Sequence, residues 1–301
     1  DPKSQFEDMY ITNFPGRTRA FVKIQDGCEN FCSYCIIPYV RGKCRSKDEG
    51  KVISEIKSLV NNGYQEVVLT GIHTGNYRVD LDTNFAHLLK ELIKIKGLKR
   101  LRISSIEATE LTDEVLKVIK ESNVIVDHLH IPLQAGSDEI LKAMNRKYDL
   151  AYFFKKIEDI RKIRPNISIT TDVIVGFPGE TRELFEKTIE TCRKLEFAKI
   201  HVFPYSERKG TKAIELPNHV DPSEKKSRAR ELLLVSKELE IAYAEKFIGK
   251  TEEVLIEENK DDYSLGHTSN YLHVKIPRTI KPNTFVSVTI KEVEYPYCLG
   301  E

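Results

Sequence analysis

The stretch GCENFCSYCIIPYVRG, residues 27–42, places Cys28, Cys32 and Cys35 within eight positions, directly after the first apolar run of the chain. This spacing brings three thiols within reach of one metal centre, and thiolates suit iron–sulfur clusters or zinc. A structural zinc site is closed by a fourth protein ligand, whereas three protein ligands leave one coordination position open for chemistry. The stretch therefore predicts either an open metal centre or a zinc knuckle completed by a distant residue such as His73.

Six short apolar runs alternate with amphipathic segments on both sides of this stretch. The runs are rich in β-branched residues, which is typical of buried parallel strands: 20–24, 66–72, 101–106, 128–133, 169–177 and 199–205. The helix-like segments are 49–64, 84–95, 111–121, 137–144, 151–163 and 180–195. Six strand–helix units are too few for a closed eight-stranded barrel. We expect an α/β fold, a partial (β/α)6 barrel with its functional residues at the carboxyl ends of the strands.

The pattern changes after this alternation. A long helix is predicted from Pro222, with Asp221 as its N-cap. After Gly249, short strands at 251–258, 271–277 and 284–293, separated by polar turns, predict a small antiparallel β-barrel. The expected domains are an N-terminal lead-in at 1–19, the partial barrel at 20–221, a linker helix at 222–246 and the β-barrel at 247–301.

Composition limits what the chain can be. It has 301 residues, 40% of them hydrophobic, with six cysteines and a net charge of +1. No run is long and apolar enough to span a bilayer, so no membrane partner is expected. The sparse cysteines exclude a disulfide scaffold and suit a reducing, cytoplasmic location, with Cys44, Cys192 and Cys298 as ordinary thiols. The first residue is Asp1 rather than Met, so we expect a processed chain or part of a longer one.

The motif GCENFCSYC resembles the C-x-x-x-C-x-aromatic-C motif of radical S-adenosylmethionine (SAM) enzymes. The resemblance implies a [4Fe–4S] cluster on the three cysteines, with SAM as the ligand of the fourth iron. In that superfamily an electron from the cluster cleaves SAM to a 5′-deoxyadenosyl radical, which abstracts hydrogen. Three cysteines are then enough, because the cosubstrate occupies the open position. The superfamily's usual fold is a partial (β/α)6 barrel.

Further blocks resemble, in order, those of the methylthiotransferases, which insert a methylthio group at an unreactive C–H carbon. They are residues 36–46, 130–146, 170–181 and 201–211, and the last fifty residues resemble the RNA-binding TRAM barrel that ends those proteins. Those enzymes also carry an N-terminal domain whose three further cysteines bind an auxiliary cluster, the source or carrier of sulfur. We expect that second [4Fe–4S] cluster only in a full-length protein. The 301 residues are expected to cleave SAM without completing sulfur insertion.

The resemblance also implies which strand-end residues contact the cosubstrate. The candidates for its amino, ribose and adenine groups are Tyr34, Thr70, Gly71, Ser105, Glu107, Gln134, Gly176, Phe203 and Pro204. Arg41, Arg45 and His73 are candidates for substrate contact. The residues alone leave simpler interpretations open: turn glycines at Gly71 and Gly176, solvated arginines, and a histidine that caps a strand end.

The substrate implied by the resemblance is a tRNA anticodon loop. The segment TGIHTGNY, residues 70–77, resembles the branch that acts on N6-threonylcarbamoyladenosine at tRNA position 37. Alternatives are isopentenyladenosine at that position, a ribosomal-protein aspartate, or a non-catalytic, zinc-stabilised RNA-binding protein. A reductant protein such as flavodoxin or ferredoxin would supply the electron.

The charge of the C-terminal segment conflicts with RNA binding. Residues 247–301 carry six Lys and Arg against nine Asp and Glu, although a phosphate-binding module is expected to be basic. The basic stretch KKSRAR at 225–230 is a candidate for the missing positive surface, with Tyr271, Tyr263 or Phe285 available for base stacking. Its alternative is a solvated helix face.

Overall fold

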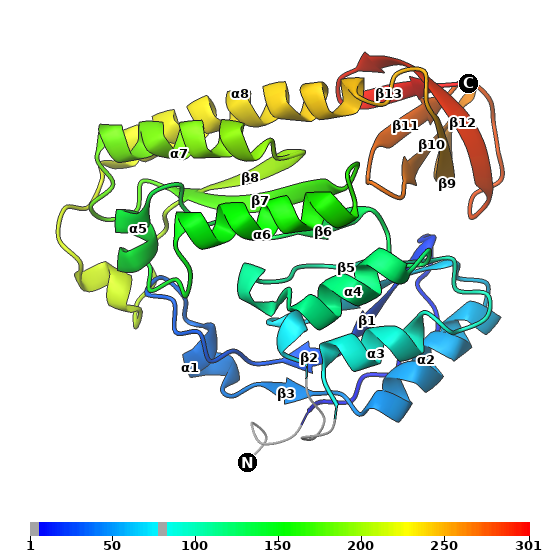
Figure 1. Ribbon diagram of the computed structural model, residues 1–301, viewed down its shortest axis with the longest axis horizontal. Coiled ribbons are helices and arrows are strands. Elements are labelled where there is room, and N and C mark those ends of the chain that lie inside the picture. The colour runs from blue at the N-terminus through cyan, green and yellow to red at the C-terminus, as the bar shows by residue number, and fades with distance from the viewer. Residues whose placement is uncertain (1–5, 78–82) are drawn as a thin grey trace.

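The computed structural model describes residues 6–77 and 83–301 and confirms the α/β fold class (Figure 1). Residues 1–5 of the expected lead-in lie outside this range. The first three parallel strands form one sheet in the order β1-β4-β5: β1 (Arg19–Lys23), β4 (Glu66–Thr70) and β5 (Arg100–Ile103). The next three form a second sheet, β6-β7-β8: β6 (His128–His130), β7 (Ser168–Val175) and β8 (Lys199–Pro204).

The two sheets meet edge to edge and together make an open half-barrel. A parallel bridge joins Leu101 to Ile125, and the amide of Ile106 donates to the carbonyl of His130 at 3.0 Å. The crossover helices are α2 (Glu49–Asn61), α3 (Phe85–Leu92), α4 (Asp113–Glu121), α5 (Asp138–Ala143), α6 (Leu150–Ile163) and α7 (Arg182–Leu195). Three 3-10 turns follow strand ends or join elements: η1 (Thr74–Asn76), η2 (Ala108–Glu110) and η3 (Lys212–Glu215).

Alternate residues of each strand point to opposite faces, and this separates the core from the lumen. In β5, Leu101 and Ile103 are buried in the hydrophobic core, whereas Arg102 lines a cavity on the inner face. Its partners across the sheet, Val68 and Phe21, line the same cavity. The inner face is thus available for a ligand, while the outer face packs on the helices.

The C-terminal strands close into a five-stranded barrel in the order β10-β11-β13-β12-β9. They are β9 (Thr251–Lys260), β10 (Tyr263–Thr268), β11 (His273–Ile276), β12 (Phe285–Glu294) and β13 (Tyr297–Gly300). The expected small barrel is confirmed, but it is not antiparallel throughout, because β11 and β13 are parallel. A closed ring with an odd number of strands cannot alternate in direction, so one neighbouring pair must run the same way.

The helix α8 (Pro222–Glu245) connects the half-barrel to this small barrel and lies along α7 and β8 (Figure 1). Asp221 is its N-cap and accepts a hydrogen bond from the amide of Ser223. The basic stretch near its start is solvated only in part, with Lys226 and Arg230 exposed. Lys225 and Arg228 are buried, and Arg228 forms ion pairs with Glu180 and Glu224.

Within the described residues, no helix combines the length and apolar character that crossing a membrane requires.

A buried arginine fixes the small barrel against the half-barrel. Arg100, 4% exposed, donates to the carbonyl oxygens of His267 at 2.9 Å and of Glu253 at 2.6 Å. Its guanidinium also lies 3.7 Å from the buried carboxylate of Glu66. Arg100 is thus a buried, charged contact between the two parts, beside hydrogen bonds from Arg19 to Tyr271 and from Gln65 to Asn283.

Replacing Arg100 with Met should destabilise the protein by roughly 3 kcal/mol, because two buried carbonyl groups and one carboxylate lose a charged donor. Limited proteolysis should then cut near α8, and thermal unfolding should begin at a lower temperature. Lys96→Met, at an exposed position, is the control and should change neither measurement. A variant that resists protease like the original protein would contradict this role of Arg100.

Candidate active site

The cysteine stretch is held by a short hairpin at the carboxyl end of β1. The strands β2 (Gln25–Asp26) and β3 (Arg45–Ser46) pair antiparallel, and the loop between them contains the three cysteines and helix α1 (Ile37–Arg41). Gln25 is fully buried and links the loop to the next strand end: its amide donates to the carbonyl of Gly27, and its oxygen accepts from the amide of His73 at 2.7 Å. The loop is therefore fixed to the edge where active sites of such barrels lie.

Gly27 at the start of the loop cannot be replaced by another residue without strain. Its φ is +78°, and a β-carbon there would lie 2.1 Å from the carbonyl oxygen of Lys43. The close approach allows the Cys28 amide to donate to the carbonyl of Gly42 at 3.1 Å, which closes the base of the loop.

The tip of the loop is anchored to distant segments. The amide of Ser33 donates to the carbonyl of Met144 at 3.0 Å, and its hydroxyl donates to the carbonyl of Ala143 at 2.8 Å. The side chain of Asn145 donates to the carbonyl of Phe31 at 2.8 Å. The last residue of α5 and the two residues after it therefore hold the backbone of the cysteine loop.

Arg146 is a site residue that sequence analysis missed. Its side chain is 3% exposed, and Nη1 lies 3.2 Å from the Cys32 sulfur. Its guanidinium also forms an ion pair with Glu107 and contacts the Tyr148 hydroxyl. A cation against a cysteine sulfur stabilises the thiolate that a metal needs. The stretch AMNR contains no feature that distinguishes this arginine from a surface one.

Glu107 and Tyr34, two of the candidates for cosubstrate contact, both lie beside Arg146. Glu107 caps η2 and pairs with Arg146. The Tyr34 hydroxyl lies 3.5 Å from Arg146, and its ring contacts Phe177 edge-on. Burial raises the pKa of Tyr34 well above its ordinary value, so its phenol remains neutral beside the cysteine loop.

His73 lies on the opposite side of the cysteine loop. Its Nε2 is 2.6 Å from a carboxylate oxygen of Glu110 and 3.3 Å from the side-chain amide of Asn30. Burial lowers the pKa of His73, but hydrogen bonds with the thiols of Cys28 and Cys44 and with Glu110 outweigh it and raise the pKa to about 12. The structure thus brings His73 and Cys44 to the cluster loop, although Cys44 was interpreted as an unrelated thiol.

Arg41 and Arg45, the two arginines expected to contact substrate, both lie near the carboxylate of Asp26. Arg45 Nη2 is 3.2 Å from Asp26, and Arg41 Nη1 is 3.9 Å from the same oxygen. Burial opposes ionisation of Asp26, but hydrogen bonds from Lys23 and the Gly27 amide and the positive charges of Lys23 and Arg41 lower its pKa. Arg45 is largely enclosed and closes the hairpin, whereas the Arg41 side chain is 51% exposed and faces outward.

The remaining candidates lie at strand ends. Thr70 ends β4, and a β-carbon on Gly71 would lie 3.1 Å from Gln25, so the backbone of Gly71 packs closely on that side chain. Gln134 lies beyond the end of β6, where the chain forms an isolated bridge to β7. Its φ is +68°, an unusual conformation for a residue with a side chain. Ser105 is partly exposed just beyond β5.

The expected adenine residues separate into two groups. Phe203 is 50% exposed, and both it and Pro204 end β8 on the open side. Gly176 has φ +70°, and a β-carbon there would lie 2.4 Å from Lys225 of α8. Gly176 therefore packs on the linker helix in this structure.

The donor chemistry of the loop fits an iron–sulfur cluster. Cys28, Cys32 and Cys35 are reduced and partly exposed, and burial together with the neighbouring thiols raises the pKa of Cys35. A positively charged cluster would lower that pKa and bind the thiolates. In the part of the chain that the structure describes, no three His, Cys, Asp or Glu side chains are already gathered around one metal position.

Comparisons with known proteins agree with this site. Residues 22–192 match the radical SAM superfamily. The chain is 44% identical to "Threonylcarbamoyladenosine tRNA methylthiotransferase MtaB" of Bacillus subtilis (strain 168), over 98% of this chain and 67% of that protein. It is 40% identical to "tRNA-2-methylthio-N(6)-dimethylallyladenosine synthase" of Desulfitobacterium hafniense (strain Y51), over 95% of this chain and 65% of that protein.

A solved structure supports the fold alone. Coproporphyrinogen III oxidase (HemN) from Escherichia coli superposes with a TM-score of 0.56 at 17% identity, covering 75% of this chain and 54% of that one. The half-barrel with a three-cysteine loop at its carboxyl edge defines a radical SAM enzyme. The chain belongs to that superfamily and, within it, to the methylthiotransferase family, which makes it a transferase.

Replacing Gly27 with Ala should disrupt the cysteine loop, because the new β-carbon overlaps the Lys43 carbonyl. We expect the iron and sulfide bound per chain after anaerobic reconstitution to fall several-fold. The matched control is Gly16→Ala, since Gly16 also has a positive φ, +71°, but open space around it. That variant should cost only about 1 kcal/mol of stability and bind iron normally. Equal iron content in the two variants would contradict the role assigned to Gly27.

Proposed function

We propose that this chain is the radical SAM and RNA-binding part of an enzyme that methylthiolates C2 of N6-threonylcarbamoyladenosine at position 37 of tRNA. The observation that carries the proposal is the cysteine loop, which is anchored at the carboxyl edge of the half-barrel with Arg146 beside Cys32. The relatives named for the threonylcarbamoyl substrate support the choice of nucleoside. The segment at 70–77 supports the same branch.

Each part of the proposed site has a separate task. Cys28, Cys32 and Cys35 would hold a [4Fe–4S] cluster, which supplies one electron for the reductive cleavage of bound SAM. Arg146 neutralises charge at Cys32 and fixes Glu107. The strand-end residues Thr70, Ser105 and Gln134 provide hydrogen-bonding groups on the same edge, and Phe203 provides an exposed ring there. The location proposed for this reaction is the cytoplasm, with a reductant protein as electron donor.

The RNA surface of the small barrel is also part of the proposal. Tyr271, considered for base stacking, instead lies between the domains, where its ring stacks on His128 and His267. Lys226 and Arg230 remain the exposed cations of the basic stretch on α8. We therefore place the tRNA contact on exposed residues of α8 and the small barrel and exclude Tyr271.

The nucleoside substrate can be tested in cells. Deleting the gene should remove the 2-methylthio derivative of N6-threonylcarbamoyladenosine from total tRNA and leave the unmodified threonylcarbamoyl nucleoside in its place. Mass spectrometry of digested tRNA measures both. Loss of a methylthio-isopentenyl nucleoside instead would assign the chain to the other tRNA branch, and unchanged tRNA nucleosides would favour a protein substrate.

The 301 residues by themselves should cleave SAM without forming methylthiolated product. Besides the cluster loop they contain Cys44, which contacts that loop, and Cys192 and Cys298, which are buried in different domains. These three cannot form a second cluster. Anaerobically reconstituted protein with dithionite should release 5′-deoxyadenosine, and Cys32→Ala should not. Methylthiolated tRNA formed by this chain alone would overturn the expectation.

A further inference from the structure

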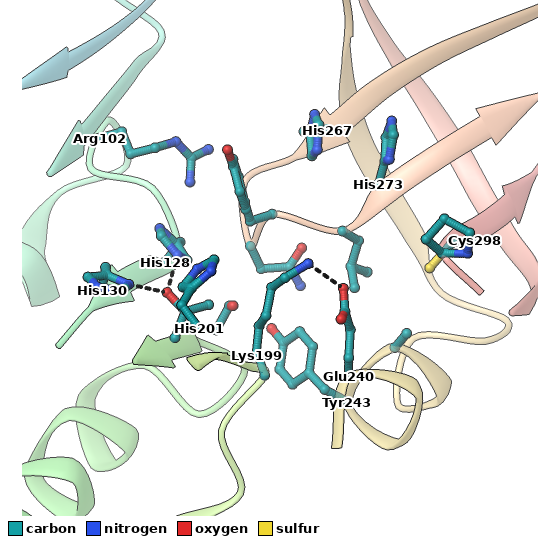
Figure 2. Close-up of a pocket in the computed structure, with 18 of the residues that line it drawn as sticks. Arg102, His128, His130, Lys199, His201, Glu240, Tyr243, His267, His273 and Cys298 are labelled. Carbon is teal, nitrogen blue, oxygen red and sulfur yellow. Dashed lines mark hydrogen bonds and ion pairs between the residues drawn. The ribbon is translucent and has the colours of Figure 1, made fainter. Parts of the chain in front are cut away.

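A cavity of about 460 Å³ lies between the lumen of the half-barrel and the small barrel. Five of the eight histidines of the chain line it: His128, His130 and His201 from the half-barrel, and His267 and His273 from the small barrel (Figure 2). Arg102 extends toward the centre of this group (Figure 2). The cavity is absent from the sequence predictions, because its residues come from six strands and the small barrel.

The guanidinium of Arg102 is only partly satisfied by the described residues. Its side chain is 4% exposed, and Nε donates to a carboxylate oxygen of Glu66 at 2.9 Å. Glu66 also forms an ion pair with Arg100, so two guanidinium groups share one buried carboxylate. Within the described part of the chain, Nη1 and Nη2 of Arg102 have no hydrogen-bond partner. Buried charged donors without partners are costly, so these two nitrogens favour an anionic ligand.

A second unpaired atom lies beside this guanidinium. His128 is 6% exposed, its Nε2 contacts the Thr170 hydroxyl at 3.0 Å, and its Nδ1 has no partner among the described residues. Burial, followed by the charge of Arg102, lowers the pKa of His128 well below its usual value. The imidazole of His128 is therefore neutral, and it provides a hydrogen-bonding group beside the Arg102 guanidinium.

The acidic groups around the cavity are already paired and do not compete for Arg102. Glu240 forms an ion pair with Lys199 at 3.1 Å, and Asp172 lies 3.3 Å from Nε2 of His130. Glu257 pairs with Arg19 and His267. On the side of the small barrel, the Tyr271 ring covers Arg102, with its centroid 4.5 Å from the guanidinium carbon.

The cavity reaches the carboxyl ends of β5 and β6 only, since β7 and β8 line it with residues of their amino-terminal halves, among them Thr170 and Lys199. Ser104 follows β5 directly, lines the cavity and precedes the candidate Ser105. Arg102 lies two residues deeper on the same strand. A nucleobase bound at the strand ends could therefore direct a substituent down the lumen toward Arg102.

We propose that Arg102 and His128 bind the carboxylate of the threonylcarbamoyl group and thereby select the substrate. This inference rests on the proposed function. A guanidinium with two free parallel donors matches a carboxylate in a bidentate pair. The dimethylallyl group of the competing nucleoside has no polar atom and would leave those donors buried and unpaired. A site built to bind a polar group rejects an analogue without it far more strongly than an apolar pocket rejects an extra methylene.

The test is a binding measurement with synthetic anticodon stem–loops that differ only at position 37. The probes carry N6-threonylcarbamoyladenosine, its neutral methyl ester, isopentenyladenosine or adenosine. The original protein should bind the acid about 10- to 100-fold more tightly than the ester. Arg102→Gln should lose that preference and leave ester binding unchanged, and Arg102→Lys should recover part of it.

Controls separate this role from folding and from general electrostatics. Arg193→Gln removes the same charge from the exposed surface of α7 and should keep the preference for the acid. Thermal unfolding checks that Arg102→Gln folds. The comparison of acid with ester is made on the original protein, so it does not depend on the folding of any variant.

The outcomes separate this inference from the proposed function. If the original protein prefers the acid to adenosine but treats acid and ester alike, the inference fails and the proposed substrate stands. If Arg102→Gln weakens all probes equally, Arg102 contacts a phosphate and the inference also fails. A preference for isopentenyladenosine, or no preference at all, would contradict both.

Discussion

The buried carboxylate of Glu66 is the interaction on which both halves of the molecule depend. It lies between Arg100 and Arg102, which are 3.7 and 2.9 Å away. Arg100 uses its remaining donors on backbone carbonyls of the small barrel, so it helps to position that barrel. Arg102 keeps two donors free toward the lumen. One carboxylate therefore supports the domain interface and pairs with only one nitrogen of Arg102, whose other two nitrogens have no partner among the described residues.

The cysteine loop depends on a different constraint, a tight backbone approach at its base. Gly27 approaches Lys43 closely, and the buried Gln25 fixes the loop to the neighbouring strand end. Segments far along the chain then hold its tip through Ser33 and Asn145. The three thiols reach the carboxyl edge of the half-barrel because the fold, and not the loop alone, determines where they lie.

Sequence patterns predicted the regular elements well where the chain was strongly periodic. All six strands of the half-barrel lie where apolar runs predicted them, because buried parallel strands need apolar side chains on the outer face. The strands β10 and β13 were missed, since YSLGHT and YCLG are short and contain glycine, which weakens a strand pattern. Their positions follow from barrel closure, a tertiary property.

The site was predicted less completely, because motifs identify ligands but not their charged neighbours. The cysteine motif and the strand-end positions were visible in the sequence. Arg146 and Arg102 were not, because an arginine in a loop or in an alternating strand has the same pattern whether it is solvated or buried. Lys225 and Arg228 show the converse error, since half of the cations of a basic run considered as surface are buried.

The central claim is that three cysteines hold a cluster whose open position takes SAM. Electron paramagnetic resonance of the anaerobically reconstituted, reduced protein tests it most directly. We expect about four iron and four sulfide per chain and a cluster signal that changes shape when SAM is added. A colourless protein that binds zinc, or a cluster signal that SAM leaves unchanged, would contradict the account.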